Sequence, residues 1–413
     1  MLKEFIDYIK ENKTKIIFIT TFFSIGFIVE FFYRKPLFDN SVEIAQAVQD
    51  SMPSSTTFFK YWAYLGVIEF YYAIIIFLFF PISYCFTFFC NMIISVHLCN
   101  FSKLVYSQGR PFLLDKIVYI TCEAGYGNPS GHSFQSTSNL LAFATMFMDL
   151  FKMDKKYCII IYIICAILIL SINFSRIILG VHSINQVIFG DTLGFTVYFI
   201  IVQIIQPHKI DIKKFYEIFL NFKFHIFNGI FILINTISFI IAAVANNELE
   251  SENYEILKQK LIEICHSKEN GMLARDAKSK TLFIMGYYGM IYGMTLLTYF
   301  VKHRYLGKYQ ELNYYYKNTK EKWYIKYGVR FLLIAISYVP LISIYSSKGG
   351  DIYVIYILAS AFPFFLYGFM LFGINYTLLI LLNLANENLY FNMVKENEEN
   401  KNEGLLLDDS QKE

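Results

Sequence analysis

The feature that most constrains this chain is a series of apolar runs, most of them close to the roughly 20 residues that an α-helix needs to cross a bilayer. Only 17% of the residues are charged and 56% are hydrophobic, whereas soluble domains average about 25% charged residues. We therefore predict an all-α fold, a polytopic transmembrane helix bundle of about ten spans. The predicted spans are residues 14–33, 64–82, 84–102, 134–151, 157–175, 184–206, 224–246, 281–301, 327–346 and 352–374.

The distribution of charge predicts the orientation of these spans. Lysine and arginine are concentrated in the connections 152–156, 207–223 and 302–326, and such positive connections face the cytoplasm. This orientation gives a cytoplasmic N-terminus, and the first apolar run is too long for a signal peptide, so it is retained as an anchor. Segment 247–280 is then an outer connection, and its pattern leaves open whether it is an amphipathic helix or a solvated connector. A net charge of +3 gives no reason to expect a nucleic-acid partner.

The cysteines carry no metal-binding pattern. Most of the seven lie inside apolar runs, where they are typical of small hydrophobic side chains. Cys122 and Cys265 lie in polar segments, and the sequence leaves open whether they form a disulfide. There is also no carboxylate cluster of the kind that magnesium requires, so we predict neither a metal nor a cofactor.

Three short polar segments interrupt the apolar pattern, and the predicted topology puts all of them on the non-cytoplasmic side. They are residues 103–111 (KLVYSQGRP), 122–132 (CEAGYGNPSGH) and 175–182 (SRIILGVH). Each segment begins or ends a predicted span, so the bundle can bring them together at one end.

The residue types in these segments suit phosphate chemistry. The guanidinium groups of Arg110 and Arg176 can each grip two phosphate oxygens, and Lys103 adds a third positive charge. Ser130 and Gly131 precede a predicted helix, where a capping hydroxyl and closely approaching backbone N–H groups favour an anion. Taken singly, cations at a membrane boundary more often extend to lipid headgroups. Their occurrence together with two histidines, His132 and His182, favours phosphoryl transfer instead.

The spacing K-x6-RP, PSGH and SR-x5-H resembles the three-part motif of the type 2 phosphatidic acid phosphatase (PAP2) superfamily. That superfamily includes lipid phosphate phosphatases, glucose-6-phosphatases and vanadium haloperoxidases. The resemblance implies a six-helix PAP2-type phosphatase core within the predicted bundle. It also implies a metal-independent phosphoric monoester hydrolase that works through a phosphohistidine intermediate.

The resemblance assigns a role to each matching position. His182 corresponds to the nucleophile, and His132 corresponds to the general acid that protonates the leaving oxygen. The matching phosphate-binding set is Lys103, Arg110, Ser130, Gly131 and Arg176. Many superfamily members carry an aspartate four residues after the nucleophile. Gln186 stands there in this chain, and we predict that it orients the His182 ring.

Two features resemble the glucose-6-phosphatase branch, namely Gln186 and the pattern Cys-Glu-x-Gly-x-Gly-x-Pro-Ser-Gly-His over residues 122–132. Two others depart from it, because this chain has an additional N-terminal span and ends in Asp-Asp-Ser-Gln-Lys-Glu rather than in a dilysine signal. The resemblance favours hydrolysis of a sugar phosphate like glucose 6-phosphate. The alternatives are a lipid phosphate substrate, such as phosphatidate, a sphingoid-base phosphate or a polyprenyl phosphate, and transfer of the phosphoryl or head group to another acceptor.

The predicted organisation has four parts. Residues 1–60 form an anchor helix and outer connector, and residues 61–206 form the phosphatase core. Residues 207–394 add further transmembrane helices, and residues 395–413 form a polar, disordered tail. The expected location is the endoplasmic reticulum membrane, with the active site on the lumenal side. The expected partners are the phosphorylated substrate and membrane lipids, and the sequence does not determine the oligomeric state.

Overall fold

The structure is a computed structural model, and every secondary-structure element that it describes is helical, which confirms the all-α prediction. It describes residues 10–51, 55–67, 69–114, 123, 125–210, 212–248, 259, 262–263, 281–304, 323–340 and 353–382. The α-helices are α2 (Lys13–Ser51), α3 (Ser55–Ala63), α4 (Glu69–Phe79), α5 (Ile82–Tyr106), α6 (Gly131–Gln135), α7 (Leu141–Leu150), α8 (Lys155–Ile178), α9 (Ile184–Tyr198), α10 (Ile212–Ile218), α11 (Phe222–Glu248), α14 (Ile284–Arg304), α16 (Trp323–Ser337), α18 (Tyr353–Phe369) and α19 (Asn375–Leu381).

Short 3-10 and π segments extend or connect several of these helices. The π segment η3 (Ser136–Leu140) joins α6 to α7 in one helical run, and η7 (Met370–Ile374) joins α18 to α19 in the same way. The π segment η4 (Phe199–Ile205) extends α9, and the 3-10 segment η2 (Pro111–Leu114) follows the end of α5. Two further 3-10 segments, η1 (Tyr64–Val67) and η5 (Pro207–Lys209), complete the described connections.

The predicted count of about ten membrane spans is not confirmed. Six of the described segments are long and apolar enough to cross a bilayer: Lys13–Ser51, Ile82–Leu113, Lys155–Ile178, Ile184–Lys209, Phe222–Ala242 and Ala361–Leu381. Helices also lie in the other predicted ranges, but α4 has only 11 residues and α16 only 15. A straight helix of that length is shorter than the roughly 30 Å of a bilayer core.

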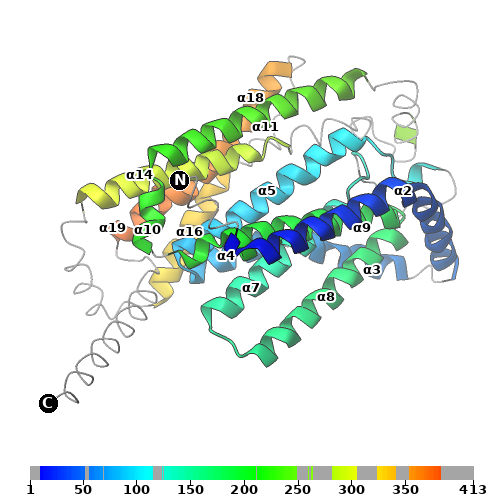
Figure 1. The fold of residues 1–413 in the computed structure, drawn as a ribbon, viewed down its shortest axis with the longest axis horizontal. Coiled ribbons are helices and arrows are strands. Elements are labelled where there is room, and N and C mark those ends of the chain that lie inside the picture. Colours follow the sequence, from blue (N-terminus) through cyan, green and yellow to red (C-terminus); the bar gives the residue numbers. More distant parts are fainter. Residues whose placement is uncertain are drawn as a thin grey trace.

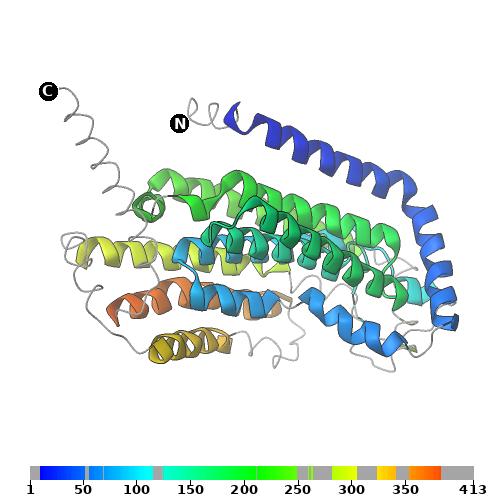
Figure 2. The same ribbon diagram turned by 90° about the horizontal axis from the view of Figure 1, so that it is seen from below.

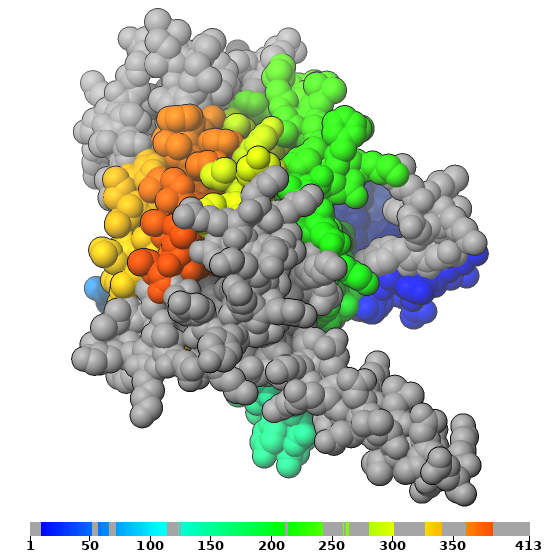
Figure 3. Space-filling view, turned by 90° about the vertical axis from the view of Figure 1, so that its left-hand side faces the viewer, coloured from blue at the N-terminus to red at the C-terminus, as the bar shows by residue number. Residues whose placement is uncertain are grey.

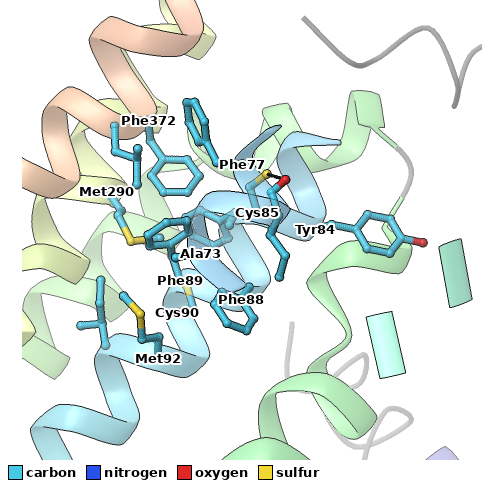
Figure 4. Close-up of a cluster of buried hydrophobic side chains, with 14 of the residues drawn as sticks. Ala73, Phe77, Tyr84, Cys85, Phe88, Phe89, Cys90, Met92, Met290 and Phe372 are labelled. Carbon is cyan, nitrogen blue, oxygen red and sulfur yellow. Dashed lines mark hydrogen bonds between the residues drawn. The ribbon is translucent and has the colours of Figure 1, made fainter. Parts of the chain in front are cut away.

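Helix α5 lies at the centre of the bundle, and most of its side chains are buried. It contacts α4, α6 and α9 on one side and α11 and α14 on the other (Figure 1). Phe88 and Phe89 of α5 are completely buried, and the side chains around Phe89 include Met290 from α14 and Phe372 from η7 (Figure 4). The C-terminal helices therefore share one hydrophobic core with the helices that carry the polar motifs.

Helices α14 and α18 approach each other closely along a line of glycines, and Figure 3 shows the two helices side by side next to α11. A Cβ atom at Gly289 would overlap the backbone carbonyl oxygen of Phe365, and a Cβ at Gly368 would overlap that of Gly286. Small residues at such a crossing let the two backbones meet and gain van der Waals contact.

We expect Gly289→Leu to lower the free energy of unfolding by at least about 1–3 kcal/mol, the usual cost of overpacking a core. The space beside Gly289 is filled by backbone atoms, which cannot move aside as a side chain can. Thermal unfolding in detergent measures this as a lower Tm. Gly229→Leu in α11 is the matched control, because no neighbouring atom lies within 4 Å of a Cβ added there. Equal Tm values for the two variants would contradict the predicted contact.

Helix α2 is much longer than a membrane span requires, with 39 residues, and it contains Pro36. Proline removes a backbone hydrogen bond and kinks a helix. Figure 2 shows α2 as two segments at a sharp angle, the first packed along α9 and the second turning across one end of the bundle. Helices α5 and α8 end, and α9 begins, at this same end (Figure 1).

Several predictions lie outside the described residues. They are the pairing of Cys122 with Cys265, nearly all of segment 247–280 and the tail 395–413. The membrane orientation, the four-part division and the compartment stay predictions.

Candidate active site

Arg110 reaches the site from the turn that follows α5. The helix ends because Ser107 adopts a left-handed conformation, with φ 46°, and its N–H donates to the carbonyl of Lys103. This turn leads the chain back toward the bundle, and the Arg110 side chain is buried. Its Nε donates to the carbonyl of Gly125 at 2.9 Å, which fixes the guanidinium plane. Its Nη1 lies 3.2 Å from His182 Nε2.

The Pro-Ser-Gly-His segment begins the helical run that continues through α7. Ser130 is the N-cap of α6, and its hydroxyl accepts hydrogen bonds from the N–H and the hydroxyl of Ser133. The Ser130 N–H donates to the carbonyl of Gln186 at 2.9 Å, so this segment is tied to the start of α9. A Cβ at Gly131 would lie 3.6 Å from Lys103 Nζ, which places the ammonium beside this helix start.

The two arginines converge on a single carboxylate, that of Glu123. Arg110 Nη1 donates to Glu123 Oε2 at 2.9 Å, and Arg176 Nη2 donates to the other oxygen, Oε1. Both guanidinium groups are almost completely buried, whereas the Glu123 side chain is 27% exposed. Arg176 Nε is also buried and has no hydrogen-bond partner among the described residues. The two arginines thus form a pocket of positive charge that holds one oxyanion.

His182 lies in the tight turn between α8 and α9. Gly180 adopts φ 70° in that turn, and the His182 N–H donates to the carbonyl of Arg176. The ring Nδ1 lies 2.9 Å from the carbonyl oxygen of Gly127 and 3.3 Å from Gln186 Oε1. Because carbonyl oxygens only accept, Nδ1 carries the proton. The lone pair of Nε2 therefore faces the arginine pocket.

Burial, together with the positive charges in the pocket, keeps both imidazoles neutral. Burial, together with Arg110 and Arg176, holds the pKa of His182 well below its usual range. Burial and the neighbouring Arg176 likewise lower the pKa of His132 to about 3. Burial alone would raise the pKa of Glu123, but the two arginines outweigh it and hold this pKa well below its usual range. The site is thus built from an ionised carboxylate, arginine cations and neutral imidazoles.

Gln186 connects three parts of the site. Its Oε1 lies near His182 Nδ1 and accepts from the Ser183 N–H in a capping box at the start of α9. Its Nε2 donates to the carbonyl of Gly109, next to Arg110. The position predicted to orient the ring therefore contacts it, although the carbonyl of Gly127 is the closer acceptor.

All the residues singled out from the sequence lie in one region of the described structure. His182, Arg110, Arg176 and Gln186 are linked through direct contacts or through Glu123. His132 and Lys103 lie within electrostatic range of the same group. No cluster of three or more histidine, cysteine, aspartate or glutamate side chains with metal-binding geometry occurs in the part of the chain that the structure describes.

Three contributors to this region were not predicted from the sequence. Glu123 was noted within a motif but received no role, and the acceptor carbonyl of Gly127 is a backbone atom that no residue pattern reveals. The third is Glu30 of α2, which hydrogen-bonds to Asn128 and Asn185. An ionisable residue inside an apolar span is a signal that could have found Glu30.

Comparison with known proteins identifies the family of the segment that carries the three motifs. The family model described as "PAP2 superfamily" matches residues 80–210. This chain carries a PAP2 superfamily domain. Phosphatidylglycerophosphatase B of Bacillus subtilis is 28% identical over 79 residues, which are 19% of this chain and 39% of that relative. The match thus spans about two fifths of the length of that relative.

One similar solved structure is the crystal structure of the first transmembrane PAP2 type phosphatidylglycerolphosphate phosphatase from Bacillus subtilis. It is 20% identical, covers 48% of this chain and 97% of its own, and superposes with a TM-score of 0.39. The match of the family model confirms, for residues 80–210, the superfamily predicted from the three motifs. The comparisons do not show the glucose-6-phosphatase-like branch, which stays a prediction.

Proposed function

We propose that this integral membrane protein hydrolyses a phosphomonoester through a phosphohistidine intermediate on His182. The observation that supports the proposal best is the pair of buried arginines that hold the Glu123 carboxylate beside the Nε2 lone pair of His182. A phosphoryl group offers a larger negative charge and more acceptor oxygens, including one for Arg176 Nε, which has no partner among the described residues. In this proposal the substrate phosphate displaces the Glu123 carboxylate.

The proposed reaction has two steps. The Nε2 lone pair of His182 forms a bond to phosphorus while the ester P–O bond breaks, and His132 gives a proton to the departing oxygen. In the second step a water oxygen bonds to phosphorus, its proton passes to His132, and the N–P bond breaks to release phosphate. Arg110, Arg176 and Lys103 neutralise the charge that spreads over the phosphoryl oxygens. Nδ1–H of His182 stays bound to the carbonyl of Gly127, which stabilises the positive charge on the phosphorylated ring.

The low pKa of His132 predicts how the reaction depends on pH. Free His132 is neutral at neutral pH, because its pKa is about 3. A phosphomonoester loses its second proton at a pKa of about 6, so below that pH the monoanion can bring the proton that His132 then delivers. We expect kcat/KM to fall tenfold per pH unit above about pH 6. Because the pKa of His182 is also lowered, its protonation should limit kcat/KM only well below its usual pH range.

Measuring kcat/KM against pH with two substrates of different second pKa tests this prediction. The alkaline limb should move with the pKa of the substrate, as expected if the substrate supplies the proton. An alkaline limb at the same pH for both substrates would contradict it, and so would an acid limb at the ordinary histidine pKa.

Two observations favour different substrates for this site. The similar Bacillus subtilis protein is a phosphatidylglycerophosphatase, which favours a lipid phosphate. Gln186 and the Cys-Glu-x-Gly-x-Gly pattern favour a sugar phosphate such as glucose 6-phosphate, hydrolysed on the lumenal side of the endoplasmic reticulum. The phosphoryl-binding residues are common to both substrates.

A substrate panel tests the proposed function. Purified protein in detergent is given phosphatidylglycerol phosphate, phosphatidate and glucose 6-phosphate, and released phosphate is measured with the His182→Ala variant as blank. Release from one class above the blank identifies the substrate class. No release from any of the three, by a protein that is folded by its Tm, would count against phosphatase activity.

A further inference from the structure

We propose that α2 is a positioning element of the active site and that Glu30 is its principal residue. This inference rests on the proposed function, because the two segments that Glu30 contacts lie next to the proposed nucleophile and the proposed phosphate-binding turn. Helix α2 precedes residue 80, where the PAP2 match begins. No residue of α2 belongs to the three polar motifs.

The Glu30 carboxylate receives hydrogen bonds both from the loop before α6 and from the first turn of α9. Its Oε1 accepts from Asn128 Nδ2 at 2.6 Å, and its Oε2 accepts from Asn185 Nδ2 at 3.1 Å. All three side chains are almost completely buried. Arg34, one turn later in α2, donates to Oε1 at 2.8 Å and balances the charge. The Arg34 guanidinium also lies over the ring of Tyr106 at the end of α5.

Both amides that Glu30 holds are adjacent to groups that touch His182. Asn128 follows Gly127, whose carbonyl oxygen accepts from His182 Nδ1. Asn185 Oδ1 accepts from the hydroxyl of Ser183, the residue after His182, at 2.5 Å. A displacement of either amide would therefore move an acceptor or a neighbour of the nucleophilic ring.

Two further contacts from α2 hold the turn that carries His182. The hydroxyl of Ser41 accepts from the N–H of Ile184 at 2.7 Å, just after the turn. Gln49 Nε2 donates to the carbonyl of Ile178 at 2.7 Å, just before it. The second segment of α2, which crosses this end of the bundle in Figure 2, thus ties down both ends of the turn.

The contacts from α2 are expected to affect the rate of phosphoryl transfer. Phosphoryl transfer depends on holding the nucleophile in line with phosphorus, and small displacements cost large factors. When a residue orients a reacting group, removing a hydrogen bond that holds this residue typically lowers activity by about 10- to 100-fold. In Glu30→Gln one carboxylate oxygen becomes an NH2 group, which cannot accept a hydrogen bond from an asparagine NH2. One of the two asparagines therefore loses its hydrogen bond to residue 30.

The first test is kinetic, with Glu43→Gln as the matched control because Glu43 is an exposed glutamate of the same helix. We expect Glu30→Gln to lower kcat and the single-turnover rate of phosphoenzyme formation by about 10- to 100-fold. The Ki of inorganic phosphate should change much less, because both arginines stay in place. The control should behave like the wild type. Wild-type kinetics for Glu30→Gln would overturn the proposal.

The second test is hydrogen–deuterium exchange, which needs no turnover. In Glu30→Gln we expect faster exchange in peptides covering residues 125–131 and 178–187, with unchanged exchange in residues 284–304. Equally faster exchange throughout the bundle would overturn the proposal, since it indicates general destabilisation. If the wild type and Glu43→Gln both fail to release phosphate, the proposed function fails. In that case a local change in exchange in Glu30→Gln still supports the positioning contact. The absence of such a change overturns the contact.

Discussion

Replacing His182 with alanine should abolish phosphate release, with a loss in kcat of at least about 10⁴-fold, as expected when a covalent nucleophile is removed. In the wild type, the buried ring is held with its Nδ1 proton on the carbonyl of Gly127 and its Nε2 facing the arginines. Phosphate release and trapping of ³²P-labelled protein from labelled substrate measure the two consequences together.

The matched control for this variant is His225→Ala. His225 lies at the start of α11, where its ring bonds to the carbonyl of Phe219, in a part of the chain that carries none of the three motifs. It should retain both turnover and labelling. Labelled protein in His182→Ala, or turnover near the wild-type level, would show that another group attacks phosphorus.

Replacing Arg176 with lysine should reduce kcat/KM by about 10- to 1,000-fold although the positive charge is kept. The guanidinium now presents Nη2 to the Glu123 carboxylate and has Nε still unpartnered among the described residues, so it can bind two oxygens of a phosphoryl group. A lysine ammonium is a single point on a flexible stem and cannot reproduce that two-point contact. Steady-state kinetics with the best substrate of the panel measure the loss.

Arg330→Lys is the control for this substitution, since Arg330 is an equally buried arginine in α16. Its Nη1 donates to the carbonyl of Leu78, and its guanidinium lies near the ring of Phe77. We expect a lower Tm with kcat/KM close to that of the wild type. Equal losses of kcat/KM in the two variants would mean that Arg176 supports the fold rather than the phosphoryl group.

The sequence predicted the parts of this protein that depend on local pattern. Apolar runs near 20 residues predicted the helical class, because a chain in a bilayer must satisfy its backbone hydrogen bonds within each segment. The span count was not confirmed because the pattern does not distinguish a short apolar helix such as α4 from a spanning one. Both are apolar on every side, and only their packing separates them.

The candidate site was predictable for a similar reason. Arg110, Ser130 and His182 belong to short motifs whose residue types and spacing are themselves the signal. Glu30 belongs to no motif. Its partners Asn128 and Asn185 are 98 and 155 residues away in the chain, so only the packing of α2 on α9 brings them together.

The sequence by itself determined that this chain is an all-helical membrane protein with the residue types of a PAP2 phosphate site. The lengths of the apolar runs and the spacing of the motifs can both be read directly from the sequence. The tertiary structure alone decided which nitrogen of His182 carries the proton, which carboxylate lies between the two arginines, and that α2 contacts both the loop before α6 and the start of α9. Those outcomes depend on backbone carbonyls and on contacts between distant segments. They arise only when the helices pack.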